Sequence, residues 1–271
     1  MSALHFGSEA ARTWADYSGD YNPIHFDERI AEAATGKGGA VVHGMLAMMP
    51  LKTSQSALFW EDDGWLQWTA MLRQAMPQGF SYVMDFRVAQ PGRKVRFKLS
   101  AMNDIEAKIT GHCSVVGFDP AHYTDFQRVV VDPVEARAEL ERFSMLFPEV
   151  SPAWIAIDAM VFSRYIRLHA EAIFRNELAR HFGDTRSDVV STGQLIIMQT
   201  VHTDTFDRSL LADLKDVSIG TFAYAYAKTD ELLSNDSLFA TIDIPVWIDG
   251  VLVQVVQIGL MARKLSSFHK T

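Results

Sequence analysis

The sequence predicts an α+β protein made of two similar halves in tandem, each an antiparallel sheet wrapped around a central helix. Three observations predict this class. An apolar helical pattern beginning at Gly44 is followed by strand-like patterns, and a long helical pattern beginning at Ser151 is followed by strand-like patterns again. A proline-containing, charged stretch separates them. We therefore expect one domain over 1–120, a linker with a short helix over 121–150, and a second domain over 151–271.

The first elements are expected to be two short helices with a turn between them. Ser8 is the expected N-cap of the first helix, which would end near Tyr17. Asp27 is the expected N-cap of the second, which would run through Ala34 and end at the glycine cluster 36–39.

A longer helix is predicted from Gly44 to about Trp60, with Pro50 inside it as a source of a kink. It is apolar nearly all round at its start, as a helix wrapped by a sheet must be. Alternating apolar residues then predict three strands, which are Tyr82 to Val88, Val95 to Ala101 and Ile109 to Val115.

The second half is predicted to open on a helix with Ser151 as cap and Pro152 at its first position. Its apolar stripe continues to about His181, and Gly183 would stop it. Four strands are then expected, and they are Gln194 to His202, Ser218 to Lys228, Leu238 to Trp247 and Val251 to Ala262.

A carboxylate and an imidazole lie five positions apart, as Asp20 and His25, in the run Ser18-Gly19-Asp20-Tyr21-Asn22-Pro23-Ile24-His25. Pro23 lacks an N–H and disfavours the helical conformation before it, so a turn is expected here. A carboxylate and an imidazole that reach one water can hold it and move its proton. The alternative is that Asp20 caps a turn and His25 is a core histidine. Asn22 either orients the water or holds the turn.

A second run, Gly38-Gly39-Ala40-Val41-Val42-His43-Gly44-Met45-Leu46, places a glycine at the start of the long apolar helix. The first N–H groups of a helix have no partner within it and carry the positive end of its dipole. The backbone N–H of Gly44 is therefore a candidate oxyanion donor. A glycine required for close packing is the alternative, and both can hold.

Together these two runs resemble the MaoC-like, (R)-specific enoyl-thioester hydratases, which have the hot-dog fold; the resemblance is strong over residues 13–49. It implies that Asp20 and His25 are the catalytic pair and that Gly44 binds the thioester carbonyl. It places Asn22, His43 and Met45 in the substrate-binding site, with His43 mainly shaping the turn. It implies no metal and no redox cofactor, because the substrate is carried as a thioester of coenzyme A or of acyl carrier protein.

The chain departs from the family pattern in its second half, which has no such motif. That half would supply part of the substrate tunnel and stand in for a dimer partner, so a monomeric pseudo-dimer or a homodimer is expected. The interval between His25 and His43 is also about one residue longer than the common pattern, and Lys37 lies where an aromatic residue often sits. These changes bear on the substrate class.

Composition excludes several other classes. A formal net charge of -8 argues against nucleic acid and anionic membranes as partners. No apolar run is long enough for a transmembrane helix, and the first residues lack the pattern of a signal peptide. The one cysteine, Cys113, excludes an internal disulfide and a cysteine-rich zinc site. A cytoplasmic enzyme is the expectation.

Two other groups of residues have two interpretations each. A basic strip on one predicted strand, formed by Lys94, Arg96 and Lys98, is either a solvated face or a contact for carrier phosphates. Large side chains after the long helix either pack in the core or line an acyl tunnel, and they are Trp65, Trp68, Met71 and Met76.

Three functions remain open. The favoured one is a lyase that hydrates a trans-2-enoyl thioester to the (R)-3-hydroxyacyl thioester, or the reverse dehydration. A thioesterase on the same fold would direct water at the carbonyl, and a non-catalytic acyl-thioester-binding subunit would keep the motif as architecture.

Overall fold

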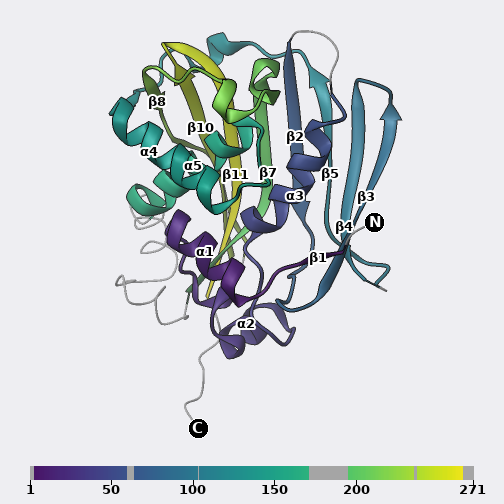
Figure 1. Ribbon diagram of the computed structural model, residues 1–271. Helices are drawn as coiled ribbons and strands as arrows, with labels where there is room; N and C mark the ends of the chain where they lie inside the picture. Colours follow the sequence, from purple (N-terminus) through teal and green to yellow (C-terminus); the bar gives the residue numbers. More distant parts are fainter. Residues whose placement is uncertain (1–2, 60–63, 103, 171–194, 235–236, 265–271) are drawn as a thin grey trace.

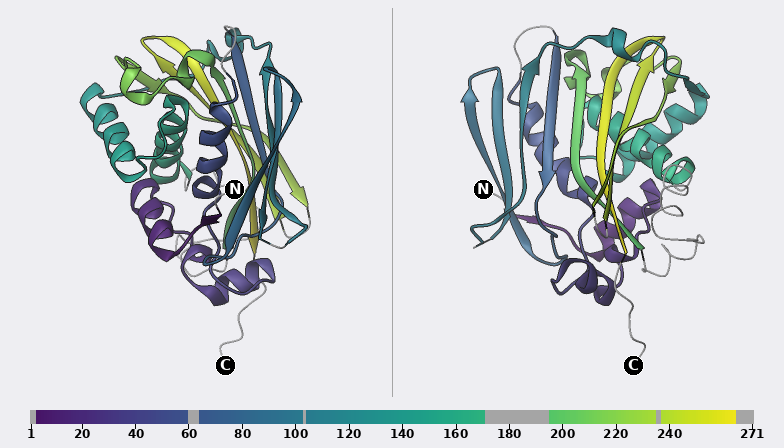
Figure 2. Two further views of the ribbon diagram at one scale, coloured as in Figure 1. Left: turned by 45° about the vertical axis from the view of Figure 1, so that its right-hand side comes forward. Right: turned by 180° about the vertical axis from the view of Figure 1, so that it is seen from behind.

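The computed structural model describes residues 3–59, 64–102, 104–170, 195–234 and 237–264 (Figure 1). Its strands form one large curved sheet, and the helices gather on one side of it (Figure 2). This is the α+β arrangement predicted from the sequence, with a helix for each half of the sheet to wrap.

Every strand pair in the described sheet is antiparallel, and the order is β1-β3-β4-β5-β2-β7-β11-β10-β8-β6, with β9 also on β10. The strands are β1 (Leu4–His5), β2 (Trp65–Leu72), β3 (Ser81–Gln90), β4 (Lys94–Ala101), β5 (Ala107–Val116), β6 (Val129–Val131), β7 (Leu195–Asp207), β8 (Phe222–Tyr224), β9 (Ala227–Ser234), β10 (Ser237–Ile248) and β11 (Val251–Lys264).

The helices are α1 (Ser8–Ser18), α2 (Glu28–Thr35), α3 (Gly44–Ser56), α4 (Pro133–Leu146) and α5 (Ala153–Leu168), with short 3₁₀ turns η1 (Pro23–His25), η2 (Pro120–Tyr123), η3 (Arg208–Leu211) and η4 (Leu214–Asp216). α3 and α5 are the central helices of the two halves, and they contact each other as well as the sheet. Every residue of α5 from Ala153 to Tyr165 is buried. Pro50 lies inside α3, as predicted.

The two halves join where β2 pairs with β7, from Trp65 opposite Asp207 to Met71 opposite Val201. The sequence prediction missed β2. Its alternation was nonetheless present, because Leu66, Trp68 and Ala70 are buried on one face of the strand. Three of the four large residues left open between core and tunnel thus belong to this seam, and they are Trp65, Trp68 and Met71.

Three predicted boundaries in the second half were wrong. Pro152, and not Ser151, is the N-cap of α5, which begins at Ala153. α5 ends at Leu168 and not near His181, and 171–194, with Gly183 and the predicted strand start at Gln194, lie outside the described residues. The single strand predicted over 218–228 is instead part of two strands, β8 and β9. The break falls opposite Pro245 of β10, which accepts a hydrogen bond from the Ala225 N–H but has no N–H to return.

The stretch 121–150 packs against the second half. β6 adds to the sheet beside β8, and α4 lies against α5, where Arg164 forms ion pairs with Glu135 and Glu139 at 2.9 Å each. The division at 120 and 150 stays a prediction, since the sheet runs through both halves. None of the described helices combines the length and the apolar character needed to cross a bilayer.

Candidate active site

The turn that carries the motif begins where α1 ends. Gly19 takes the left-handed conformation, with φ of 80°, and its N–H donates to the carbonyl of Ala15 at 2.7 Å. Pro23 then opens η1, and the Asn22 side chain accepts from the Ile24 N–H at 3.4 Å. The predicted turn is thus present, closed by one 3₁₀ turn that brings His25 back toward Asp20.

Asp20 and His25 face each other across a space that one water can bridge. The distance from Asp20 Oδ2 to His25 Nε2 is 3.9 Å, too long for a direct hydrogen bond. The other ring nitrogen, Nδ1, lies 2.8 Å from the Val41 carbonyl oxygen and donates to it. Nε2 of the neutral ring therefore carries a lone pair directed toward the Asp20 carboxylate.

His25 is expected to be neutral at neutral pH. Burial lowers its pKa from the usual value, although Asp20 and the Val41 carbonyl act in the opposite sense. A neutral ring with a free lone pair can accept a proton from water, so protonation of His25 at acidic pH would remove this capacity.

His43 lies behind this pair, fully buried. Its ring stacks on that of His25 with centroids 3.6 Å apart, and its Nε2 donates to the backbone carbonyl of Asp20 at 3.0 Å. His43 is not among the residues that line the cavity described below. His43 is therefore positioned to hold Asp20 and His25 in place. No contact of His43 with the cavity supports its predicted role in substrate binding.

The two stacked histidines predict acid sensitivity. Burial, with the neighbouring His25, lowers the pKa of His43 to about 2, whereas an unfolded histidine titrates near pH 6.5. Below about pH 6.5 the unfolded chain therefore binds more protons, and the free energy of unfolding falls by about 1.4 kcal/mol per pH unit for each such histidine. Urea unfolding between pH 7 and 4.5 measures this slope.

His43→Gln should make this slope shallower by about 1.4 kcal/mol per pH unit, which is the contribution of one proton. The reason is that glutamine does not titrate. The control is His122→Gln at an exposed histidine, which should keep the wild-type slope. Equal slopes for His43→Gln and the wild type would show that His43 is not held neutral.

Gly44 is the first residue of α3, and no side chain caps the helix there. The first intrahelical bond runs from the Ala47 N–H to the His43 carbonyl, so the N–H groups of Gly44 and Met45 have no acceptor within the helix. Both residues line the cavity. The arrangement matches the predicted oxyanion donor.

Gly44 also has a packing reason to be glycine. A Cβ there would lie 2.6 Å from Leu72 Cδ2 and 2.9 Å from Gln199 Oε1. Gly44→Ala is expected to cost about 1–3 kcal/mol of stability by overpacking, and to lower kcat/KM up to about 100-fold by displacing groups beside the helix N-terminus. Gly117→Ala, with nothing within 4 Å, is the matched control. Unchanged stability and activity in Gly44→Ala would contradict this packing.

The cavity beside these groups has a volume of about 960 Å³ and draws its walls from both halves of the chain. The second half contributes β7 and β11, through residues such as Gln199 and Leu260. Asn22 ties the motif to this wall, because its Nδ2 donates to the Ile197 carbonyl at 2.6 Å. The second half was expected to supply part of the substrate tunnel, and its contribution to the cavity wall agrees with that expectation.

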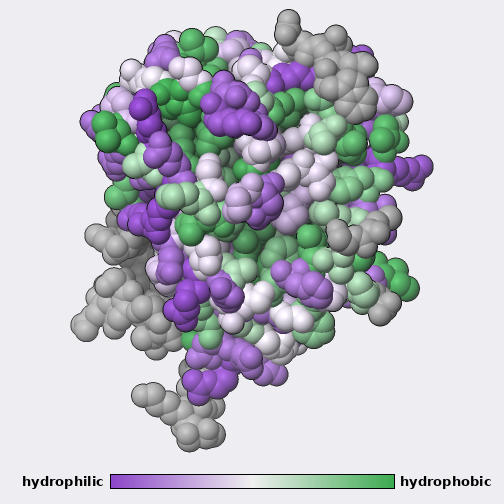
Figure 3. All heavy atoms as spheres, in the orientation of Figure 1, coloured by the Kyte–Doolittle hydropathy of each residue, from purple (hydrophilic) through white to green (hydrophobic). Residues whose placement is uncertain are grey.

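Of the basic strip and the large side chains that follow the long helix, one residue lines the cavity. Met76 does, whereas Trp65, Trp68 and Met71 do not, and Trp68 is fully buried against Phe97. The basic strip is outside the cavity wall, and its members Arg96 and Lys98 are exposed. In Figure 3, hydrophilic residues cover the lower end of the molecule around α2, where Glu28, Arg29 and Glu32 are exposed.

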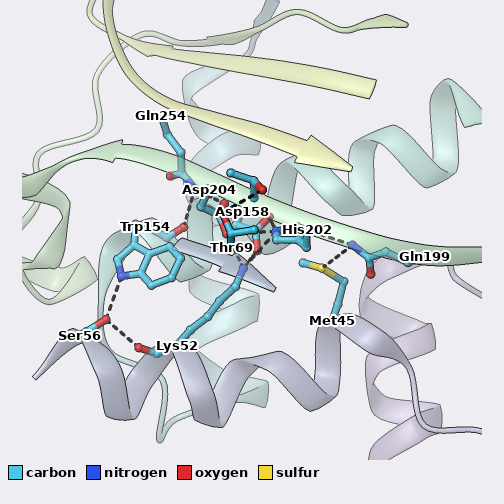
Figure 4. Close-up of polar contacts among 11 residues, drawn as sticks. Met45, Lys52, Ser56, Thr69, Trp154, Asp158, Gln199, His202, Asp204 and Gln254 are labelled. Atoms are coloured by element: carbon cyan, nitrogen blue, oxygen red, sulfur yellow. Dashed lines mark hydrogen bonds and ion pairs between the residues drawn. The ribbon is translucent and has the colours of Figure 1, made fainter. Parts of the chain in front are cut away.

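A cluster of four charged or titratable side chains lies in the core beside the cavity, and the sequence prediction missed it (Figure 4). Its members are Lys52 on α3, Asp158 on α5, and His202 and Asp204 on β7, all at most 1% exposed. A lysine and an aspartate inside apolar helix stripes could have indicated a buried charged cluster, because such residues are rarely buried without partners.

Lys52 Nζ is the centre of this cluster. It contacts Asp158 Oδ2, lies 2.7 Å from Asp204 Oδ2 and 3.2 Å from His202 Nε2, and lies over the rings of Trp68 and Trp154. Burial alone would raise the pKa of Asp204, but Lys52 and His202 lower it to about 2. The ammonium group provides the positive charge that a metal would bring to these carboxylates.

A set that could hold a metal ion is also formed by Asp20, His25 and His43, whose ligand atoms lie within 4.8 Å of one another. His43 Nε2 and His25 Nδ1, however, donate to backbone carbonyls, and these bonds orient the rings toward a water-holding pair. The expectation of no metal and no redox cofactor stays a prediction.

Comparison with known proteins gives the following. Residues 3–53 match the model of the MaoC like domain. No curated protein matches the sequence. Among solved structures, a conserved hypothetical protein of Mycobacterium tuberculosis described as having a double hotdog fold is 10% identical, with a TM-score of 0.53 over 96% of this chain and 94% of its own.

Two further solved structures have lower TM-scores. A MaoC-like dehydratase is 12% identical, with a TM-score of 0.47 over 97% of this chain and 96% of its own. An acyl-CoA thioesterase II from Mycobacterium marinum is 10% identical, with a TM-score of 0.47 over 89% of this chain and 99% of its own. The predicted tandem hot-dog fold is confirmed, and the resemblance to the MaoC-like family is confirmed over residues 3–53.

Proposed function

We propose that this protein catalyses the reversible hydration of a trans-2-enoyl thioester to the (R)-3-hydroxyacyl thioester. The observation that carries the proposal is the 3.9 Å space between Asp20 Oδ2 and His25 Nε2, on the same turn that faces the uncapped N-terminus of α3. Two proton acceptors at a water-sized separation beside free N–H donors suit addition of water to a conjugated carbonyl.

In the hydration direction a water donates one hydrogen to the Asp20 carboxylate and the other to His25 Nε2. Its lone pair attacks C3, the C2–C3 π electrons move toward the carbonyl, and the thioester oxygen gains negative charge against the Gly44 N–H. Asp20 takes the water proton and delivers it to C2, so the C2–H and C3–O bonds form on the same face. The carboxylate is regenerated, and dehydration runs the same steps in reverse.

The thioester carrier is proposed to be coenzyme A or acyl carrier protein. Cationic side chains from both halves, Lys37, Arg73 and Arg263, are among the residues that line the cavity. They support an anionic carrier, because both carriers bring phosphate to the site. The β2–β7 seam provides within one chain the contact that a dimer of single hot-dog units would need, which supports a pseudo-dimer as the working unit.

The test is an assay of the purified protein on short trans-2-enoyl-CoA substrates. Loss of the conjugated enoyl absorbance is followed together with free thiol, and the product configuration is determined on a chiral column. Loss of the double bond without thiol, giving the (R) product, supports the proposal. Thiol release would favour a thioesterase. No signal with coenzyme A or carrier-protein substrates of several lengths would favour a binding subunit.

A further inference from the structure

Gln199 links the buried charged cluster to the oxyanion site. A β-bulge in β7 makes this possible, because Gln199 pairs with Leu260 and Val201 pairs with Gly259, which leaves Thr200 unpaired. The extra residue turns Gln199 onto the same face of the strand as His202. Gln199 Nε2 then lies 2.8 Å from His202 Nδ1 (Figure 4). The amide oxygen lies beside Gly44, 2.9 Å from where a Cβ on that residue would be.

Charge balance favours a proton on both ring nitrogens of His202. The cluster contains two carboxylates, Asp158 and Asp204, and one ammonium group, Lys52, and all three are buried. A neutral His202 would leave one net negative charge in the core, whereas an imidazolium makes the cluster neutral. His202 Nε2 lies 3.1 Å from a carboxylate oxygen of each aspartate.

The electrostatics of His202 agree with this balance. Burial and the Lys52 charge lower its pKa, but the two aspartates outweigh them and raise the pKa above the usual value. A neutral His202 could also carry its proton on Nδ1, and Lys52 would favour this tautomer by donating to Nε2. In that tautomer, as in the imidazolium, the Nδ1–H faces Gln199.

A proton on Nδ1 fixes the orientation of the Gln199 amide. As placed, the amide Nε2 faces Nδ1 at 2.8 Å and also lies 3.9 Å from Met45 Sδ. Two N–H donors cannot face each other, so with Nδ1 protonated the amide is turned over by 180° and its oxygen accepts from Nδ1–H. The amide N–H₂ then points the other way, into the position 2.9 Å from where a Cβ on Gly44 would lie. Gln199 and Gly44 both line the cavity.

We infer that Gln199 is a second hydrogen-bond donor to the thioester oxygen, beside the Gly44 N–H, and that the protonated Nδ1 of the buried His202 holds its amide in the donating orientation. The inference rests on the proposed function for its substrate. It gives the buried cluster a role in positioning: Lys52, Asp158 and Asp204 hold the proton on His202, and His202 orients Gln199.

The first test is kinetic. Gln199→Met keeps the length of the side chain and removes the donor, so kcat for hydration should fall about 100-fold with KM little changed. Gln67→Met is the matched control, because Gln67 is also half-buried, lies on the neighbouring strand β2 and is outside the cavity wall. If the amide only caps α3 with its oxygen, Gln199→Met should lower stability and leave kcat unchanged, which would overturn the inference.

The second test does not depend on turnover. ¹⁵N NMR of histidine-labelled protein distinguishes protonated from unprotonated ring nitrogens, with His202→Asn to assign the signal. A protonated Nδ1 at pH 7 is expected, and an unprotonated Nδ1 would overturn the inference.

A third readout separates failure of this inference from failure of the proposed function. Trans-2-enoyl-CoA with a ¹³C carbonyl is bound to Asp20→Asn protein, in which hydration is expected to be slow, and to Asp20→Asn/Gln199→Met. The carbonyl signal should move downfield on binding to the first protein and less in the second. Equal signals, or no shift in either, would overturn the inference, whereas absence of hydration by the wild type with a Gln199-dependent shift would overturn only the proposed function.

Discussion

Asp20→Asn is expected to lower kcat for enoyl-thioester hydration by about 1,000-fold, within the range that general acid–base groups contribute. The substitution preserves the shape of the side chain and replaces a proton acceptor by an amide. Asparagine can still accept from the Asn22 N–H, as Asp20 Oδ1 does at 3.3 Å, so the turn should keep its conformation. His25 can hold the water but would have no carboxylate to take and return its proton. KM should change little, because the acyl cavity is intact.

Asp27→Asn is the matched control for this experiment. Asp27 lies seven positions further on, caps α2 by accepting from the N–H groups of Arg29 and Ile30, and is not in the cavity wall. Its amide variant should keep the wild-type kcat. The hydratase mechanism would be contradicted if Asp20→Asn kept activity within tenfold of the wild type, since no other carboxylate in the described cavity wall is placed beside His25.

The turn from Gly19 to His25 was predictable because its cause is local. Gly19, Pro23 and the residues between them decide the backbone path through their own conformational limits, and Asp20 and His25 are brought together by a few dihedral angles. The N-terminus of α3 was predictable for the same reason, because Gly44 is followed directly by an apolar helical pattern. Sequence could not show that His43 lies behind the cavity wall, since its stacking on His25 depends on the path of 26–42.

The buried cluster was not predictable because its members are far apart in sequence. Lys52 and Asp158 belong to different halves, and His202 and Asp204 reach them only when β7 pairs with β2. Each residue alone indicated a polar group on an apolar face, without naming its partner. The position of Gln199 depends in addition on the unpaired Thr200, and strand alternation predicts that Gln199 and His202 point to opposite faces.

Lys52→Met is expected to reduce the free energy of unfolding by about 3–5 kcal/mol, the cost of leaving a buried carboxylate pair without its central cation. Methionine keeps most of the volume of the side chain, so the loss measures charge and hydrogen bonding more than packing. Asp158→Asn should cost less, because His202 can lose a proton to rebalance the cluster. After loss of Lys52, none of the other described members of the cluster can supply a second positive charge. Urea unfolding at pH 7 gives both values.

The double variant Lys52→Met/Asp158→Asn discriminates between charge balance and simple packing. With one carboxylate and one cation removed, Asp204 and His202 remain as a neutral pair, so the double variant should be more stable than Lys52→Met alone. Lys98→Met is the exposed control, since Lys98 pairs with Asp85 at 3.4 Å on the outer face of the sheet with both side chains about half exposed; it should change stability far less. Additive losses in the double variant would mean that the four groups contribute independently, and the cluster could then not hold the His202 proton that positions Gln199.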